Sequence, residues 1–477
     1  MTNPTILLTL LSLVQLLLGC AKVGPDHLEP TMDLPSSWQS GIGGGLTTRQ
    51  PDPELLAEWW TTLGDPLLAE LVLQAVAGNL DLQQARARLA EARAGRDLTS
   101  AALFPTIDFS GSVTRARSGG SDATRYSTGF DAVWELDLFG GIRRSVEAAE
   151  AAAAAGREDL RDVLVTLAAE VALNYIDFRT FQARLAIAYQ NLDAQEQTYA
   201  LTEARYRSGL TSELALQQAR YLVYGTRAQI PNLETGLART ANLLAVLLGR
   251  PPGSLDGKLE ALEPLPELPA SVAVGIPADI LRRRPDIRRA ERDLAAQTAR
   301  VGAAEAELYP SFTLGGSIGL DALSAGNLFS SDSRSSSFGP RINLPIFTGG
   351  AIRSNIRIQS ARQESALIEY RSTVLTALQE VEDVLTAYAR EQERNLSLRQ
   401  SLEAAREASI LAEIQFQAGL VNFTEVLIAR GSLLSFEDQL AQSTGTMTLN
   451  LIRLYKALGG GWASIFPEQV TINEEKQ

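Results

Sequence analysis

The stretch from Phe338 to Leu420 constrains the fold most, because its hydrophobic period changes in the middle. Its first part alternates apolar and polar residues, which is typical of a strand whose two faces meet different solvents. The apolar positions are Phe338, Pro340, Ile342, Leu344 and Ile346. After Ala351 the apolar spacing becomes 4-3-4-3, at Val374, Leu378, Val381, Leu385 and Tyr388. This spacing predicts a helical seam of coiled-coil type, on a helix roughly 100 Å long.

The chain carries this pattern twice. Phe104-Pro105 recurs as Tyr309-Pro310, and Gly140-Gly141 recurs as Gly349-Gly350. The segments 206–210 and 416–420 also match each other. Each copy predicts helices, a β-hairpin, a long helix, a turn and a returning helix. A tandem duplication of this unit is therefore the expected architecture.

The expected organisation follows from these landmarks. It is a signal peptide (1–19), an N-terminal arm (20–60), a first repeat (61–250), a Pro-rich connector (251–277), a second repeat (278–462) and a C-terminal tail (463–477). Hairpins are expected at about 105–139 and 310–348, and the long helices should turn near 209 and 419.

Composition excludes several classes of function. The net charge of −13 argues against nucleic-acid binding, which needs clustered Lys and Arg. His27 and Cys20 are the single residues of their kinds, which argues against a zinc site, a disulfide framework and His- or Cys-based catalysis. The basic run Arg282 to Arg284 is offset by nearby acids and is interpreted as a solvated turn. No catalytic set is recognisable, so we expect neither an enzyme nor a cofactor.

The amphipathic strands indicate that the chain inserts into a membrane. No apolar run after residue 20 reaches the roughly 18 residues of a membrane helix, so insertion must use strands. Four strands per chain are too few to close into a barrel. Open sheet edges in lipid would leave backbone N–H and C=O groups without hydrogen-bond partners. Membrane barrels need at least about eight strands. The chain must therefore associate with further copies, and a homotrimer would supply twelve strands. We expect a mainly α protein whose copies together form a membrane β-barrel. The alternative is a non-porous coiled-coil lipoprotein.

The N-terminus predicts export and lipidation. Residues 6–19 have the length of a signal-peptide core. The tetrapeptide Leu17-Leu18-Gly19-Cys20 resembles a bacterial lipobox, which implies acylation of Cys20. The alternative is a signal peptide with an incidental cysteine. Ala21 follows instead of the aspartate that commonly retains lipoproteins in the inner membrane, which favours the outer membrane. The segment from Ala21 to Gly45 is interpreted as an extended surface arm.

The chain resembles the TolC-like outer-membrane factors of tripartite efflux systems, in their NodT-like lipoprotein branch. The matching residues are Cys20 with Val23-Gly24-Pro25-Asp26, Trp59-Trp60, Gly64-Asp65-Pro66, Asn79-Leu80-Asp81-Leu82, Leu138-Phe139-Gly140, the segment 276–287 and the segment 344–350. The resemblance implies a trimeric twelve-stranded β-barrel on a long α-helical barrel with an equatorial domain. It also implies passive export of small molecules, with a periplasmic adaptor and an inner-membrane pump as partners. The alternative is the duct of a type I protein secretion system.

Two turns and one acid are candidate sites. Gly209 and Gly419 break the long helices at the end farthest from the strands, although a left-handed structural glycine would explain each turn alone. The resemblance implies adaptor contacts at Arg207, Ser208, Gly209, Leu210, Thr211, Ala418, Gly419, Leu420 and Val421. It also implies that Glu425 lines a lumenal gate. The family's second gate acid is replaced by Ile428, and the first repeat has Ala215 at the position equivalent to Glu425.

Overall fold

The computed structural model describes residues 22–40, 43, 45–269 and 271–463. These residues form two compact units. The first contains the chain up to Met32, Ala87–Glu158 and Asp286–Thr373; the second contains Asp33–Arg86, Asp159–Pro285 and Val374 onward. Within the described ranges, no helix is both long and apolar enough to cross a bilayer.

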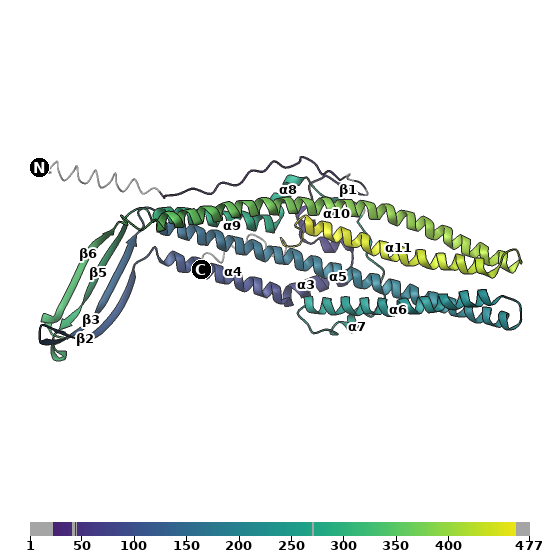
Figure 1. Cartoon of the computed structure of the whole chain (residues 1–477), viewed down its shortest axis with the longest axis horizontal. Helices are drawn as coiled ribbons and strands as arrows, with labels where there is room; N and C mark the ends of the chain where they lie inside the picture. The colour runs from purple at the N-terminus through teal and green to yellow at the C-terminus, as the bar shows by residue number, and fades with distance from the viewer. Residues whose placement is uncertain (1–21, 41–42, 44, 270, 464–477) are drawn as a thin grey trace. The chain divides into compact units, whose positions relative to one another are not determined.

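The first unit combines one sheet with four helical segments (Figure 1). The strands are β2 (Thr106–Ser118), β3 (Ser121–Leu136), β5 (Ser311–Ala322) and β6 (Arg334–Asn343). The helical segments belong to α4 (Leu80–Ala101), α5 (Gly141–Arg207), α9 (Pro285–Ala306) and α10 (Ala351–Gln417). The sheet order is β2-β3-β5-β6, entirely antiparallel, so the two hairpins join through β3 and β5.

The strand register puts the apolar residues of both hairpins on one face. Phe109 lies opposite Phe130, which lies opposite Ile318. Trp134 lies opposite Leu314, which lies opposite Pro340. Since side chains alternate along a strand, the intervening residues share the other face. That face carries Ser110, Asp108, Asp131, Ser317 and Ser337. The alternation in the sequence therefore produces one apolar and one polar face on a single sheet.

The second strand of the second hairpin is shorter than predicted at its C-terminal end. The alternating run predicted a strand through Ile346, but β6 ends at Asn343. Two physical causes are visible. Pro345 has no N–H to donate to a ladder, and the neighbouring strand β5 begins at Ser311, opposite Asn343. Between β5 and β6 the chain forms two short 3₁₀ turns, Ala325–Asn327 and Ser331–Ser333.

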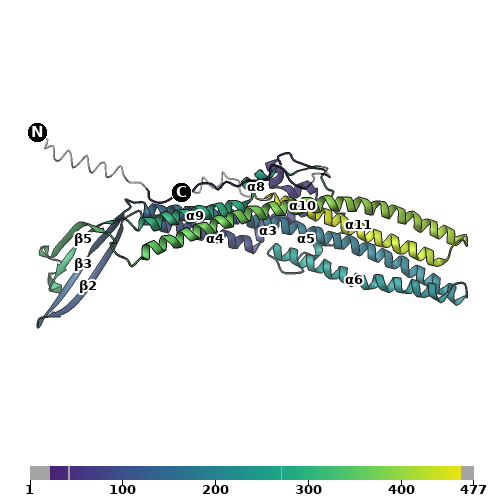
Figure 2. The same cartoon turned by 45° about the horizontal axis from the view of Figure 1, so that its top comes forward.

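The second unit contains the remaining helices. These are α2 (Pro53–Ala57), the 3₁₀ turn η1 (Trp59–Leu63), α3 (Pro66–Gly78), α6 (Glu213–Leu247), α7 (Asp256–Leu259), α8 (Pro277–Arg283) and α11 (Phe423–Ala457). In this unit α6 returns beside α5, and α11 returns beside α10 (Figures 1 and 2). The arm and the Pro-rich connector meet as two short parallel strands, β1 (Leu46–Thr47) and β4 (Val272–Ala273).

The core of the second unit uses the coiled-coil seam that the sequence predicted. Val374, Val381 and Leu385 are almost completely buried. The adjacent Leu375 is 59% exposed, so a single chain leaves this apolar side chain of α10 open. Trp59 stacks on Tyr455 with ring centroids 5.3 Å apart.

Asp65 organises one set of polar groups in this core. The Asp65 carboxylate caps α3 by accepting from the backbone N–H groups of Leu67 and Leu68. It also accepts a 2.6 Å hydrogen bond from the Tyr175 hydroxyl. Burial, reinforced by the Asp65 carboxylate, raises the pKa of Tyr175 well above its ordinary value.

One interpretation of the basic run was wrong. Arg284 does not lie in a solvated turn, because it is only 8% exposed. Its guanidinium donates to the Glu380 carboxylate over 2.7 Å and to the Ala457 carbonyl over 3.1 Å. The offsetting acid lies far along the chain, where local sequence could not identify it.

Candidate functional site

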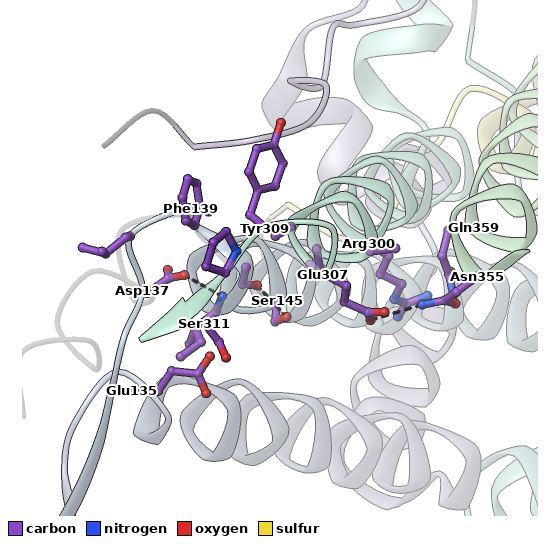
Figure 3. A pocket seen from close by; sticks show the side chains of 18 of the residues that line it. Glu135, Asp137, Phe139, Ser145, Arg300, Glu307, Tyr309, Ser311, Asn355 and Gln359 are labelled. Carbon is purple, nitrogen blue, oxygen red and sulfur yellow. Dashed lines mark hydrogen bonds between the residues drawn. The ribbon is translucent and has the colours of Figure 1, made fainter. Parts of the chain in front are cut away.

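A cavity of about 800 Å³ with a mixed polar and apolar lining lies where the strands of the first unit meet its helices (Figure 3). Its lining comes from the ends of β3, β5 and β6 and from α4, α5, α9 and α10. Figure 3 shows Glu307 and Asn355 facing each other, and the Asn355 amide donates to the Glu307 carboxylate over 3.2 Å.

Asp137 organises the end of the first hairpin beside this cavity. Its carboxylate accepts from the backbone N–H groups of Ile142 and Arg143, at 3.1 and 2.8 Å. The Arg143 side chain also donates to it over 3.1 Å. An acid is favoured here because the free N–H groups at a helix N-terminus attract negative charge. Asp137 therefore fixes the angle at which the strand enters α5.

The N-terminal arm docks on the same junction through a buried arginine. The Arg144 side chain is 1% exposed. Its guanidinium donates to the carbonyls of Val23 and Gly24, each over 2.9 Å, and pairs with Asp26 at 2.9 Å. The Val23 N–H donates to the Phe139 carbonyl over 3.1 Å. The arm segment 22–26 is therefore held directly against the end of the hairpin.

Glu147 completes this cluster. It pairs with Arg144 at 3.0 Å and also with Lys22. Burial alone would raise the pKa of Glu147, but the hydrogen bonds from Lys22 and Arg144 outweigh it and hold the pKa below its ordinary value. The resulting stabilisation is present above the unfolded-state pKa and is lost as the pH falls through the folded-state pKa.

Gly24 is required by this packing. Its φ of 90° lies in the left-handed region that favours glycine. A Cβ there would also collide with the backbone of Gly302 in α9. The motif Val23-Gly24-Pro25-Asp26 therefore forms the segment that docks on α5 and α9. Its glycine allows the arm to approach α9 closely. The Val23 and Gly24 carbonyls and the Asp26 carboxylate contact Arg144. Arg144 was not among the predicted site residues, although it lies only four residues after Gly140.

The two helix turns of the second unit are built alike. Gly209 and Gly419 have φ values of 71° and 73°. The N–H of Leu210 donates to the Arg205 carbonyl, and the N–H of Leu420 donates to the Gln415 carbonyl, both over 2.8 Å. These are Schellman caps, in which a left-handed glycine ends the helix. Both turn leucines are exposed, at 70% and 75%.

Aromatic and cationic groups join the two turns. The Arg205 guanidinium lies 4.7 Å from the ring centroid of Phe416, which is 5.0 Å from that of Phe423. The Thr424 hydroxyl donates to the Gln218 side chain over 3.2 Å. The turns at 207–211 and 418–421, which the sequence analysis predicted as adaptor contacts, therefore belong to one surface. We refer to this surface as the tip.

Glu425 lies in the first turn of α11 and is exposed. It lines an open cavity of about 720 Å³ between α10 and α11, together with Val421 and Ile428. Its counterpart Ala215 is 3% exposed, so the two repeats differ at this position. Cys20, the predicted lipidation site, lies outside the described residues. Among the residues that are described, no group of acidic, His or Cys side chains has a geometry suited to a metal ion.

Comparison with known proteins identifies relatives over nearly the whole chain. The model of a family described as "Outer membrane efflux protein" matches residues 71–250 and 276–460. Nodulation protein T of Rhizobium leguminosarum bv. trifolii is 35% identical, over 94% of this chain and 96% of that protein. The cation efflux system protein CusC of Escherichia coli O6:H1 is 33% identical, over 94% and 96%. The solved outer-membrane channel OprN matches with a TM-score of 0.87 and 35% identity, over 93% of this chain and 100% of that one.

The Arg144 cluster generates a prediction about the arm. Replacing Arg144 with Met removes the donors to Val23 and Gly24, which should cost about 1–3 kcal/mol and release the arm. Brief trypsin treatment should then cut after Lys22 several times faster, which mass spectrometry of the chain's N-terminus would measure. Arg143→Met is the matched control, because Arg143 contacts Asp137 rather than the arm. Equal cleavage of both variants and the unaltered chain would contradict the docking role.

Proposed function

The chain belongs to the outer membrane efflux protein family, and from this premise we propose that three copies form a passive duct. The duct exports small molecules across the periplasm and the outer membrane. Membership of a family of efflux channels points to a transport role rather than an enzymatic one. The proposed trimer joins three four-stranded sheets into a twelve-stranded barrel. The long helices continue it as an α-helical barrel, girdled by an equatorial domain.

The observation that carries this proposal is the sheet itself. It has one apolar face, one polar face and two edges, β2 and β6. In lipid, an open edge leaves N–H and C=O groups without partners at several kcal/mol each. A ring of three sheets removes all edges, turns the apolar faces toward lipid and encloses the polar faces. Exposed apolar side chains on α10, among them Ile368, Leu375 and Leu396, give this helix further packing surface for the same ring.

The proposed lumen is hydrophilic at strand level. Ser110 donates to Asp131 over 3.0 Å, and the hydroxyls of Ser112 and Ser127 lie 2.9 Å apart. These side chains belong to the face opposite the aromatic residues. A lumen with such a lining lets hydrated solutes pass without specific binding, as a passive duct requires.

The proposed partners are a periplasmic adaptor and an inner-membrane pump. The tip presents Leu210 and Leu420 on two similar glycine turns, and exposed leucines on rigid turns suit helix ends of a partner. We assign the adaptor contact to residues 207–211 and 418–421. The pump, rather than this chain, is expected to select the solute.

Lipidation at Cys20 would anchor each copy in the outer membrane. The docked arm supports this assignment, because Lys22 lies two residues after Cys20 and is fixed beside the hairpin. Cys20→Ala should abolish incorporation of radiolabelled palmitate and leave most of the trimer intact, since strands and helices carry the assembly. Label that persists in the variant would disprove acylation at this residue.

The apolar face generates a prediction about the membrane. Arg in place of Phe130, near the middle of β3, should cost about 2–4 kcal/mol in each copy if the position lies near the bilayer midplane. Ser317→Arg is the control, since Ser317 belongs to the polar face and lies opposite Asp131. Heat stability of the detergent-extracted oligomer should fall for Phe130→Arg only. Loss for Ser317→Arg alone would show that the faces are reversed, and equal loss in both variants would contradict the assignment of one face to lipid.

Conductance measurements test whether the chain forms a duct, and substitution of Glu425 tests whether this residue forms the gate. The purified chain should form cation-selective pores in planar bilayers, because three Glu425 carboxylates would face one axis. Glu425→Gln should weaken block by divalent cations and shift the reversal potential toward that of a less selective pore, with unchanged trimer stability. Absence of any conductance would favour a non-porous coiled-coil lipoprotein. Wild-type block and selectivity in Glu425→Gln would place this residue outside the lumen.

A further inference from the structure

We propose that a small neutral aromatic molecule with one hydrogen-bond donor, such as a phenol, binds in a cavity between the two helix hairpins of the second unit. One hairpin is α5 with α6, and the other is α10 with α11. The cavity has a volume of about 150 Å³, and all four helices contribute to its lining. The lining includes none of the residues assigned above to the tip or the gate. The inference therefore goes beyond the proposed function.

The walls of the cavity are mainly apolar. Each helix contributes one buried residue to them: Thr198 from α5, Ala219 from α6, Ser409 from α10 and Leu427 from α11. Further apolar surface comes from Leu222, Leu433 and Leu434. In another protein, an apolar cavity of about 150 Å³ binds benzene. The volume therefore suits one aromatic ring and excludes drug-sized molecules, whose pockets measure about 300–1,000 Å³.

Gly431 creates part of this space. It lies inside α11, where glycine is less favourable than alanine. A Cβ on Gly431 would meet no atom of the described chain within 4 Å, apart from its own helix backbone. Gly445 in the same helix is different, because a Cβ there would collide with the Thr180 side chain. Close packing thus explains Gly445 but not Gly431, whose missing side chain leaves the cavity open.

Two sets of polar contacts hold α5 and α11 apart on either side of the cavity. On one side, the Arg184 guanidinium donates to the Asp438 carboxylate through hydrogen bonds of 2.7 and 3.0 Å. On the other side, the Arg430 guanidinium donates to the Thr198 hydroxyl over 2.6 Å and to the Glu413 carboxylate over 3.0 Å. Most lining residues of α5 and α11 lie between these contacts in the sequence. The cavity is therefore formed before any ligand binds.

The unsatisfied polar group of the lining is an acceptor. The side-chain oxygen Oε1 of Gln195 is buried and has no hydrogen-bond partner in the described chain. A buried acceptor without a partner costs free energy, which an N–H or O–H of a ligand would recover. The Arg430 guanidinium is already held by Thr198 and Glu413, so it does not call for an anion. The ligand expected here is therefore neutral and carries a donor.

Water fits this cavity less well than a phenol. A buried water makes about three hydrogen bonds to polar partners. Thr198 offers little to it, because its hydroxyl already donates to the Ala194 carbonyl over 2.7 Å and accepts from Arg430. A phenol needs one polar partner, Gln195, and buries its ring against the leucines.

A neighbouring hollow of about 420 Å³ provides a route into the cavity. The two share Leu222, Leu427 and Gly431 in their linings. The hollow continues between α6 and α11 past Tyr221, which is 63% exposed. It therefore reaches the surface of the single chain, and a small molecule can enter from there.

The test measures binding of 4-fluorophenol to the purified full chain in detergent by fluorine NMR. Gly431→Leu fills the cavity with a side chain and should weaken binding of this probe at least about tenfold. Gly225→Leu is the matched control, because Gly225 lies in α6 outside this lining and a Cβ there also meets no neighbour within 4 Å in the described chain. All samples contain the same detergent concentration, so uptake of the probe by micelles cancels in the comparison.

A second variant tests the hydrogen bond without filling the cavity. Gln195→Met removes the acceptor and keeps a side chain of similar length. It should weaken binding of 4-fluorophenol by about three- to tenfold, the effect expected of one hydrogen bond. Binding of fluorobenzene, which has no donor, should not weaken. A general loss of structure would instead weaken binding of both probes.

Three outcomes would overturn the inference. Absence of binding to the unaltered chain would show that the cavity is closed or already filled in the oligomer. Equal binding to the unaltered chain, Gly431→Leu and Gly225→Leu would show that the probe lies elsewhere. An equal effect of Gln195→Met on both probes would refute the hydrogen bond and with it the class of ligand. Binding is measured without transport, so conductance of the same preparations tests the duct separately.

Discussion

The main constraint on this structure is that the backbone N–H and C=O groups at the edges of the sheet need hydrogen-bond partners. A four-stranded sheet with an apolar face satisfies its inner strands, β3 and β5, but leaves the outer sides of β2 and β6 open. In water such edges bind solvent; in lipid they must find another strand. The remaining features follow from that requirement. The hairpins are duplicated because each needs a neighbour, and the long helices keep further apolar surface for an adjacent helix.

The ladder between β3 and β5 gives the duplication a physical reason. It is the one place in the described chain where the two repeats pair as strands, and it holds residues 134–136 that their own hairpin does not. Fusing two hairpin units in one chain makes this seam intramolecular and fixes its register during folding. In the proposed ring, only the contact between the β2 and β6 edges then depends on association of separate copies.

The sequence predicted those features of the fold that local residue patterns determine. Alternating residues located the strands, and the 4-3-4-3 spacing located a seam in which Val374, Val381 and Leu385 are buried. The pattern failed where the partner is distant in sequence. Arg284 looked solvated because its acceptors are Glu380 and the Ala457 carbonyl. Arg144 was missed because its partners come from the arm, more than a hundred residues earlier.

Positions that are the same in the two repeats and positions that differ give different information about the chain. Gly209 and Gly419 end their helices with the same pair of hydrogen bonds, so their equivalence is explained by backbone geometry alone. The residues after them diverge. Ser212 caps α6 by accepting from the Ala215 N–H over 3.3 Å, whereas the corresponding Asn422 makes no such bond. Ala215 is buried, and Glu425 at the equivalent position lines an open cavity. A Schellman turn can form whether or not an acidic residue occupies this position. Backbone geometry therefore does not account for this difference. The divergence at Glu425 is therefore the better guide to what the tip does, and the shared glycines are the better guide to how it folds.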